Sequence, residues 1–223
     1  MENSIVAYKS LRNLTFRSAL FFLVCCGCRN TPYAQTFTRA NGENALDFVE
    51  RNTPRGLWYY DQLKTQMFET SEWSNGKSIF GFYNRTYHAG GYKDDESEDI
   101  LGYLYVPVTT DTYRRVFIDT FENEGGAAEI ISIFYANADR DTARELVVLI
   151  RWLAIHYQIY AYLYETRIYD NIAPGSFPEM MTFLKDISAK VSGDIDGDVE
   201  GKKRVSMYKS AAEIKAGLKR MGY

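Results

Sequence analysis

The sequence predicts an α+β fold, in which one antiparallel sheet carries a short N-terminal helix and two C-terminal helices packed on it. Three observations lead to this prediction. Segments rich in aromatic and β-branched residues fill the middle of the chain, which is typical of strands. The connections between the later segments are short, which favours antiparallel neighbours. Helical patterns lie before and after these segments, so we expect one domain over residues 41–223.

The expected elements follow one another along the chain. Apolar residues within 45–49 recur at helical spacing, which predicts a short helix that Pro54 ends. Asn75-Gly76 predicts a two-residue hairpin turn. Apolar residues occupy both faces of the later segment 145–152, so we expect it to be a central strand covered on both sides. The expected strands after the turn cover residues 80–87, 101–108, 113–121, 129–135, 145–152 and 158–169.

Two capping boxes predict the C-terminal helices, because each is followed by apolar residues at helical spacing. Ser176 with Glu179 is expected to begin the first helix, and Ser210 with Glu213 the second. The acidic stretch 194–200 between them starts like an EF-hand calcium loop but lacks the final glutamate of that loop. We expect this stretch to be an exposed loop.

The first 27 residues have the organisation of a signal peptide. Lys9, Arg12 and Arg17 form a positive region, and the apolar run 19–24 that follows is too short to span a bilayer. All three cysteines of the chain come next, at positions 25, 26 and 28. We therefore expect residues 1–27 to be removed from the mature chain.

The pair Gly27-Cys28 after this apolar run resembles the cleavage site of a bacterial lipoprotein signal. The resemblance implies cleavage before Cys28, a diacylglycerol on its sulfur, and an acylated tether over residues 28–40. It places the protein on a membrane of the bacterial cell envelope, with the outer membrane favoured and either face possible. Cys26 offers a second register, and a cysteine-rich ordinary signal peptide or membrane anchor is the alternative interpretation.

Composition excludes several classes of function for the mature chain. It would hold no cysteine besides the acylated one, which excludes a cysteine nucleophile, a thiolate metal site and an internal disulfide. The formal net charge of the whole chain is −3, and signal cleavage would make it more negative. Because nucleic-acid binding needs a clustered basic surface, we expect no nucleic-acid partner.

The segment from Asn137 to Glu145 carries oxygen ligands between two expected strands. Asn137, Asp139, Asp141 and Glu145 occupy positions 1, 3, 5 and 9, a spacing that lets alternate side chains converge on a hard cation. The segment resembles the calcium loop of FG-GAP and integrin-type β-hairpins, which implies that these four side chains bind Ca²⁺. The alternative is a polar turn, in which the arginines at 140 and 144 neutralise the acids.

Motifs for catalysis are missing from the sequence. It contains no G-x-S-x-G, no H-E-x-x-H and no G-x-G-x-x-G motif. The two histidines, His88 and His156, stand far apart and are expected to be structural. A pair of carboxylates is still compatible with the sequence, because glycosidases have no local signature.

Tyrosine is abundant, with 18 residues in the chain. Tyr160, Tyr162 and Tyr164 share one face of the last expected strand, and tyrosine suits binding surfaces. The alternative is that helices cover this face. The sequence thus predicts a non-catalytic, membrane-anchored envelope lipoprotein that binds a protein, such as a toxin or an assembly component, or a glycan. A hydrolase of envelope polysaccharide or peptidoglycan is the second hypothesis.

Overall fold

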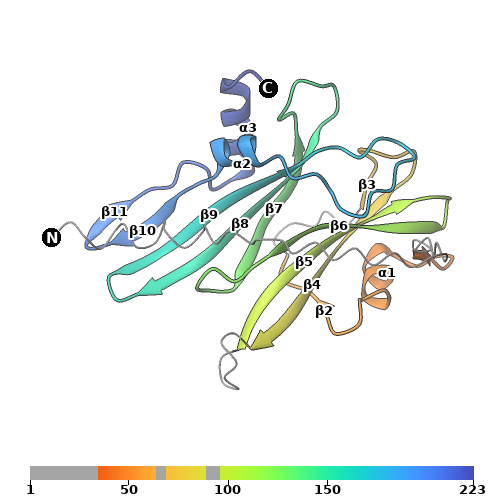
Figure 1. Ribbon diagram of the computed structural model, residues 1–223, viewed down its shortest axis with the longest axis horizontal. Helices are drawn as coiled ribbons and strands as arrows, with labels where there is room; N and C mark the ends of the chain where they lie inside the picture. Colours follow the sequence, from red (N-terminus) through yellow and green to blue (C-terminus); the bar gives the residue numbers. More distant parts are fainter. Residues whose placement is uncertain (1–34, 64–68, 89–95) are drawn as a thin grey trace, which may run out of the picture. The chain divides into compact units, whose positions relative to one another are not determined.

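The fold is mainly β, and the α+β prediction is wrong. The computed structural model describes residues 35–63, 69–88 and 96–223. Of these residues, 46% lie in strands and 14% in helices. The strands form two sheets rather than one, and they curl as a half-barrel (Figure 1). One sheet alone would leave an apolar face exposed, because most long strands here are apolar on both faces.

The elements follow one another in an order dominated by strands. The helices are short: α1 (Ala45–Arg51), α2 (Lys185–Val191) and α3 (Ala211–Arg220). The strands are β1 (Thr36–Thr38), β2 (Trp58–Tyr59), β3 (Glu69–Thr70), β4 (Ser78–His88), β5 (Glu96–Pro107), β6 (Thr112–Phe121), β7 (Ala128–Ala136), β8 (Glu145–His156), β9 (Ile159–Tyr169), β10 (Ile195–Val199) and β11 (Lys202–Arg204). The strand β1 lies within the range 28–40 expected as a tether.

Antiparallel pairing builds both sheets within the described ranges. The first sheet has the order β1-β6-β5-β4-β2, with β3 also paired to β4. The second has the order β11-β10-β9-β8-β7. Irregular register occurs between Gly102 and Tyr103 on β5 and between Ile130 and Ser132 on β7. Such bulges bend a strand and increase its twist, which is consistent with the curl of the sheets.

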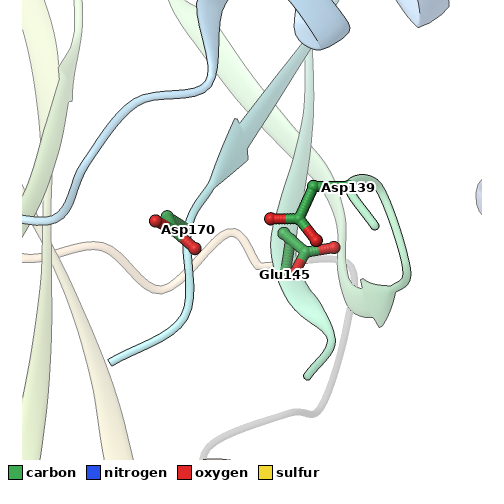
Figure 2. A group of neighbouring side chains, drawn as sticks. All are labelled: Asp139, Glu145 and Asp170. Atoms are coloured by element: carbon green, nitrogen blue, oxygen red, sulfur yellow. The ribbon is translucent and has the colours of Figure 1, made fainter. Parts of the chain in front are cut away.

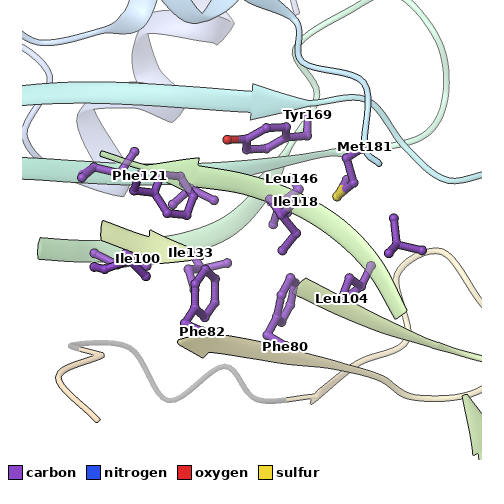
Figure 3. Packing of buried hydrophobic residues seen from close by; sticks show 14 of the residues in the cluster. Phe80, Phe82, Ile100, Leu104, Ile118, Phe121, Ile133, Leu146, Tyr169 and Met181 are labelled. Carbon is purple, nitrogen blue, oxygen red and sulfur yellow. The ribbon is translucent and has the colours of Figure 1, made fainter. Parts of the chain in front are cut away.

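The main core lies between the two sheets. Phe80 and Phe82 of β4, with Ile118 of β6, pack together with Ile133 of β7 and Leu146 of β8 (Figure 3). All five side chains are almost completely buried. Each contributes about 1.5–3 kcal/mol by leaving water, so this layer holds the two sheets together.

Helices cover the outer faces of both sheets. Phe48 and Val49 of α1 join a second apolar cluster on the first sheet. Beneath α1, the Tyr83 hydroxyl lies 3.0 Å from the Val49 carbonyl and 2.7 Å from the Tyr105 hydroxyl. Burial raises the pKa of Tyr83 because the phenolate would lose its hydration. On the second sheet, α2 and α3 pack over a third cluster around Val147 and Leu149.

The strand β8 is central, as its sequence predicts. Its side chains from Leu146 to Ile150 alternate between the core shared by the sheets and the cluster under α2 and α3. Strands β7 and β9 pair with it on either side (Figure 1). The expectation of a strand covered on both faces is therefore confirmed.

The expected helix from Ser176 is wrong. Helix α2 begins only at Lys185, after Leu184, and no side chain caps it. The segment before it pairs with strand edges instead: Met181 N donates to the Phe117 carbonyl of β6, and Leu184 N donates to the Ile168 carbonyl of β9. Unpaired backbone groups on these strands compete for the segment, which accounts for the missing helix turns.

One expected loop and one expected turn also differ from the structure. The stretch 194–200 is not a loop, because β10 pairs with β9 and forms a hairpin with β11. Glu200 and Gly201 both have positive φ, as a tight two-residue hairpin turn requires. Asn75-Gly76 lies inside the connection between β3 and β4, which is longer than the expected two-residue turn.

Candidate functional site

A group of three carboxylates lies at the end of the second sheet where β7 and β9 end and β8 begins. Asp139 comes from the loop after β7, Glu145 is the first residue of β8, and Asp170 directly follows β9 (Figure 2). One oxygen from each of the three lies within 4.8 Å of the others. Antiparallel register explains this arrangement, because Leu146 pairs with Tyr169 and their neighbours Glu145 and Asp170 therefore lie at the same level.

Glu145 is the least solvated of the three acids. Its side chain is fully buried, and its Oε2 accepts a hydrogen bond from the Ala138 backbone N–H. Its Oε1 has no hydrogen-bond partner in the part of the chain that the structure describes. Burial raises the pKa of Glu145, and the nearby charges of Asp139 and Asp141 raise it further.

Asp139 and Asp141 shape the loop that brings Asp139 near Glu145. The Asp141 N–H donates to Asp139 Oδ1 at 2.8 Å, and the Ala143 N–H donates to Asp141 Oδ1 at 2.7 Å. The second oxygen of Asp141 accepts from the Asn171 side chain at 3.1 Å. These bonds explain the spacing of acids in the sequence as turn chemistry.

Of the four predicted calcium ligands, the structure brings together Asp139 and Glu145. Asp141 and Asn137 are exposed and do not belong to the group of three acids. Asp170 belongs to it, although the sequence analysis did not select that residue. The signal that could have found it is the antiparallel pairing of the strands 145–152 and 158–169, which aligns the start of one with the end of the other.

The arginines of the loop do not neutralise the group. Arg144 forms an ion pair with Glu72, with its Nε 2.6 Å from Glu72 Oε1, and its carbonyl accepts from Trp73 Nε1. Arg140 is exposed. Among the described residues, no lysine or arginine forms an ion pair with Asp139, Glu145 or Asp170.

Electrostatics makes three ionised acids costly here. Two negative charges 4.8 Å apart repel by about 3 kcal/mol at an effective dielectric constant of ~20. A proton on Glu145 or a bound cation would relieve this repulsion. The arrangement can bind a metal ion, or it can keep Glu145 neutral.

A second feature is the apolar end of the β8–β9 hairpin. Ile155 and Tyr160 are cross-strand partners that are 65% and 66% exposed, and Tyr157 in the turn between the strands is 95% exposed. Asp198 and Glu200 of the β10–β11 hairpin line the same shallow hollow, which has a volume of about 550 Å³. The turns of the β8–β9 and β10–β11 hairpins, whose residues line this hollow, lie at the same end of the second sheet (Figure 1).

The three tyrosines predicted to bind a partner have different surroundings. Tyr160 belongs to the exposed end. Tyr162 lies under the guanidinium of Arg151, 4.4 Å from ring centre to cation, and Tyr164 packs against the cluster under α2 and α3. Helices thus cover part of this face, and Ile155 and Tyr157, which the sequence analysis did not select, extend the exposed part.

The remaining expected site residues fall elsewhere. Cys28 lies outside the described residues. His88 ends β4 and His156 ends β8, and both are exposed. Within the described ranges, no helix has the length and apolar character needed to cross a bilayer.

Comparison with known proteins identifies no relative. No protein-family model, no curated protein and no solved structure matches the chain.

Proposed function

We propose that this chain is a non-catalytic cell-envelope lipoprotein, anchored through Cys28, whose β domain binds a protein partner. The observation that carries the binding role is the exposed apolar end of the β8–β9 hairpin, formed by Ile155, Tyr157 and Tyr160. The anchor rests on the lipoprotein-like signal around Gly27-Cys28. Stable anchoring requires more than one acyl chain, which lipoprotein processing provides.

The geometry of the hairpin end suits a binding surface. Ile155 and Tyr160 are paired, so their side chains lie on the same face of the ribbon. Strand β7 pairs with β8 only as far as Trp152, so the end of β8 extends beyond its neighbour. An exposed aromatic residue costs solvation free energy without a partner and is a typical anchor in protein interfaces.

Charged residues surround this apolar centre, and this pattern favours a protein over a glycan. Asp198 and Glu200 line the hollow, and Lys202 and Lys203 are exposed on the adjoining strand β11. Protein interfaces typically have an apolar, aromatic centre and a polar rim. Lysines on an edge strand also disfavour pairing with a further strand, so side chains rather than backbone would form the contact.

Catalysis by a carboxylate pair receives less support. Hydrolysis of a glycosidic bond needs two acids that both reach the substrate. Glu145, which has the raised pKa that a general acid would need, is fully buried, so a glycan cannot contact its carboxyl group. The three acids are therefore better explained by a bound cation or proton than by catalysis.

The experiment that tests the binding role places a photo-crosslinking amino acid at position 157 of the full chain in the cells that make it. A matched control carries the same group in place of Tyr87, a partly exposed tyrosine on the first sheet. We expect a cross-linked protein from position 157 and none from position 87.

The affinity of each variant for the captured protein then shows whether the hairpin end is the binding surface. Tyr157→Ala and Tyr160→Ala should each weaken binding about tenfold, which corresponds to about 1.4 kcal/mol. Tyr87→Ala should leave the affinity unchanged. Equal affinities of all variants, or cross-links to glycan only, would contradict a protein partner at this surface.

A further inference from the structure

We propose that Asp139, Glu145 and Asp170 bind one calcium ion. This site is independent of the partner-binding surface, because its residues lie at the opposite end of β8 and β9 from Tyr157. Its ligand set also differs from the one that the loop sequence predicts, since Asp170 comes from another strand.

The unpartnered oxygen of Glu145 is the observation that points to a ligand. A buried carboxylate oxygen without a hydrogen bond or an ion pair is disfavoured, so such atoms coordinate metals or bind a proton. Arg144, the arginine next to Glu145 in the chain, pairs with Glu72 instead. A divalent cation would satisfy this oxygen and compensate the charges of Asp139 and Asp170 together.

The distances between the acids fit a single ion. Calcium binds oxygen at about 2.3–2.6 Å, so two ligands on opposite sides of it are at most about 5.2 Å apart. The three candidate oxygens lie within 4.8 Å of one another. Asp139 and Asp170 are only partly buried, which leaves room for water to complete the six to eight ligands that calcium takes.

Backbone N–H groups around the group already hold all three of its members in place. The Ala138 N–H binds the other oxygen of Glu145, and the Asp141 N–H binds Asp139. Asn171 donates from its backbone to Asp170 Oδ1 at 2.8 Å and from its side chain to Asp141. Outer contacts of this kind orient metal ligands and lower the conformational cost of binding.

Oxygen-only ligands and flexible geometry favour calcium over other ions. No histidine or cysteine belongs to the group, so zinc and copper lack their preferred ligands. Magnesium demands short bonds in near-ideal octahedral geometry and keeps most of its water. We therefore expect weaker binding of Mg²⁺ than of Ca²⁺.

The test is calorimetric titration of the full chain, in detergent, with CaCl₂ after removal of divalent ions by chelation. We expect one bound ion per chain and a melting temperature that rises with the concentration of Ca²⁺. Asp170→Asn should weaken binding at least tenfold, and Glu145→Gln should do the same. Both variants conserve side-chain shape, and the melting curve in chelator shows whether each is folded.

Asn137→Ala is the matched control. This position belongs to the ligand set that the loop sequence predicts but not to the group of three acids. Retained affinity in this variant, with loss in Asp170→Asn, would support the site. No binding up to about 10 mM Ca²⁺, which exceeds the dissociation constants of weak extracellular sites, would overturn it. Binding that Asp170→Asn leaves unchanged would overturn it as well.

Discussion

Arg167 of β9 donates to Asp119 of β6 across a distance of 3.0 Å, and this ion pair joins the two sheets. The same carboxylate oxygen accepts from the Tyr169 hydroxyl at 2.7 Å. Arg167 also donates to the Thr120 carbonyl and to Glu165. Nearby negative charges outweigh burial and raise the pKa of Arg167, so the guanidinium remains charged between the sheets.

Asp119→Ala should therefore destabilise the domain. It removes three hydrogen bonds, donated by Arg167, Tyr169 and the Thr120 N–H, and leaves the hydroxyl of Tyr169, which is fully buried, without its acceptor. We expect a loss of about 2–4 kcal/mol in the free energy of unfolding. Denaturant unfolding of both proteins measures this loss.

Glu72→Ala is the matched control, because it breaks the more exposed ion pair with Arg144. Exposed pairs contribute about 0–1 kcal/mol, so this variant should unfold almost like the original chain. Equal losses in the two variants would show that the network between the sheets adds no special stability.

Position 197 on β10 has no room for a side chain, so we expect any substitution of Gly197 to disturb the sheet. A Cβ at this position would lie 2.5 Å from the Tyr160 carbonyl oxygen and 2.6 Å from the Ala161 Cα, and φ is +151°. Gly197→Ala must therefore separate β10 from β9. We expect faster hydrogen exchange of the β10 amides and weaker partner binding, because Tyr160 of β9 pairs with Asp198 of the displaced strand.

Gly201, in the turn of the same hairpin, is the control that distinguishes backbone strain from steric overlap of a side chain. Its φ is +73°, but a Cβ there meets no atom within 4 Å. Gly201→Ala should cost only about 1 kcal/mol, from the left-handed backbone alone. Exchange rates of the β10 amides that match between the two variants would contradict the close approach of β10 and β9.

Periodicity predicted the strands well, because local pattern and tertiary packing agree there. The segment 145–152 is apolar on both faces, and only a central strand buries both faces at once. The same pattern could not reveal that there are two sheets. A buried strand face has the same apolar pattern whether a helix or a second sheet packs on it. The fold class depended on that long-range fact, and so it was predicted wrongly.

Local sequence signals predicted the wrong structure where strand edges compete for backbone hydrogen bonds. Ser176 and Glu179 match the sequence motif of a capping box, but the segment after them pairs with β6 and β9. The candidate site shows the same limit. The loop sequence identified Asp139 and Glu145, whereas Asp170 joins them only through the pairing of β8 with β9.

Substitutions of Ser210 and Ser176 test directly which of the two predicted capping boxes caps a helix. The Ser210 side chain accepts from the Glu213 N–H at the start of α3, and Glu213 accepts in return from the Ser210 hydroxyl. Ser210→Ala should cost about 1 kcal/mol of stability. Ser176 is exposed and precedes no helix turn, so Ser176→Ala should change stability by less than about 0.5 kcal/mol. Thermal melts of the two variants compare them, and a larger loss at Ser176 would argue for a helix there.

The last prediction concerns the pH dependence of stability, which follows from Glu145. Its ordinary pKa is 4.5, and burial together with the charges of Asp139 and Asp141 raises this pKa in the folded chain. As the pH rises above about 4.5, the unfolded chain loses this proton before the folded chain does. The contribution of Glu145 to stability therefore falls as the pH rises, until the pH exceeds the raised pKa.

Glu145→Gln should remove this contribution, because the amide resembles the protonated acid and does not titrate. Denaturant unfolding in chelator, from about pH 4 to about pH 8, measures the difference in stability between the original chain and the variant. We expect the variant to gain stability relative to the original chain as the pH rises. Calcium should reduce or reverse this gain, because it stabilises the ionised carboxylate of the original chain and binds the variant weakly. A difference that is constant with pH in chelator would show that Glu145 titrates in the folded chain as it does in the unfolded one.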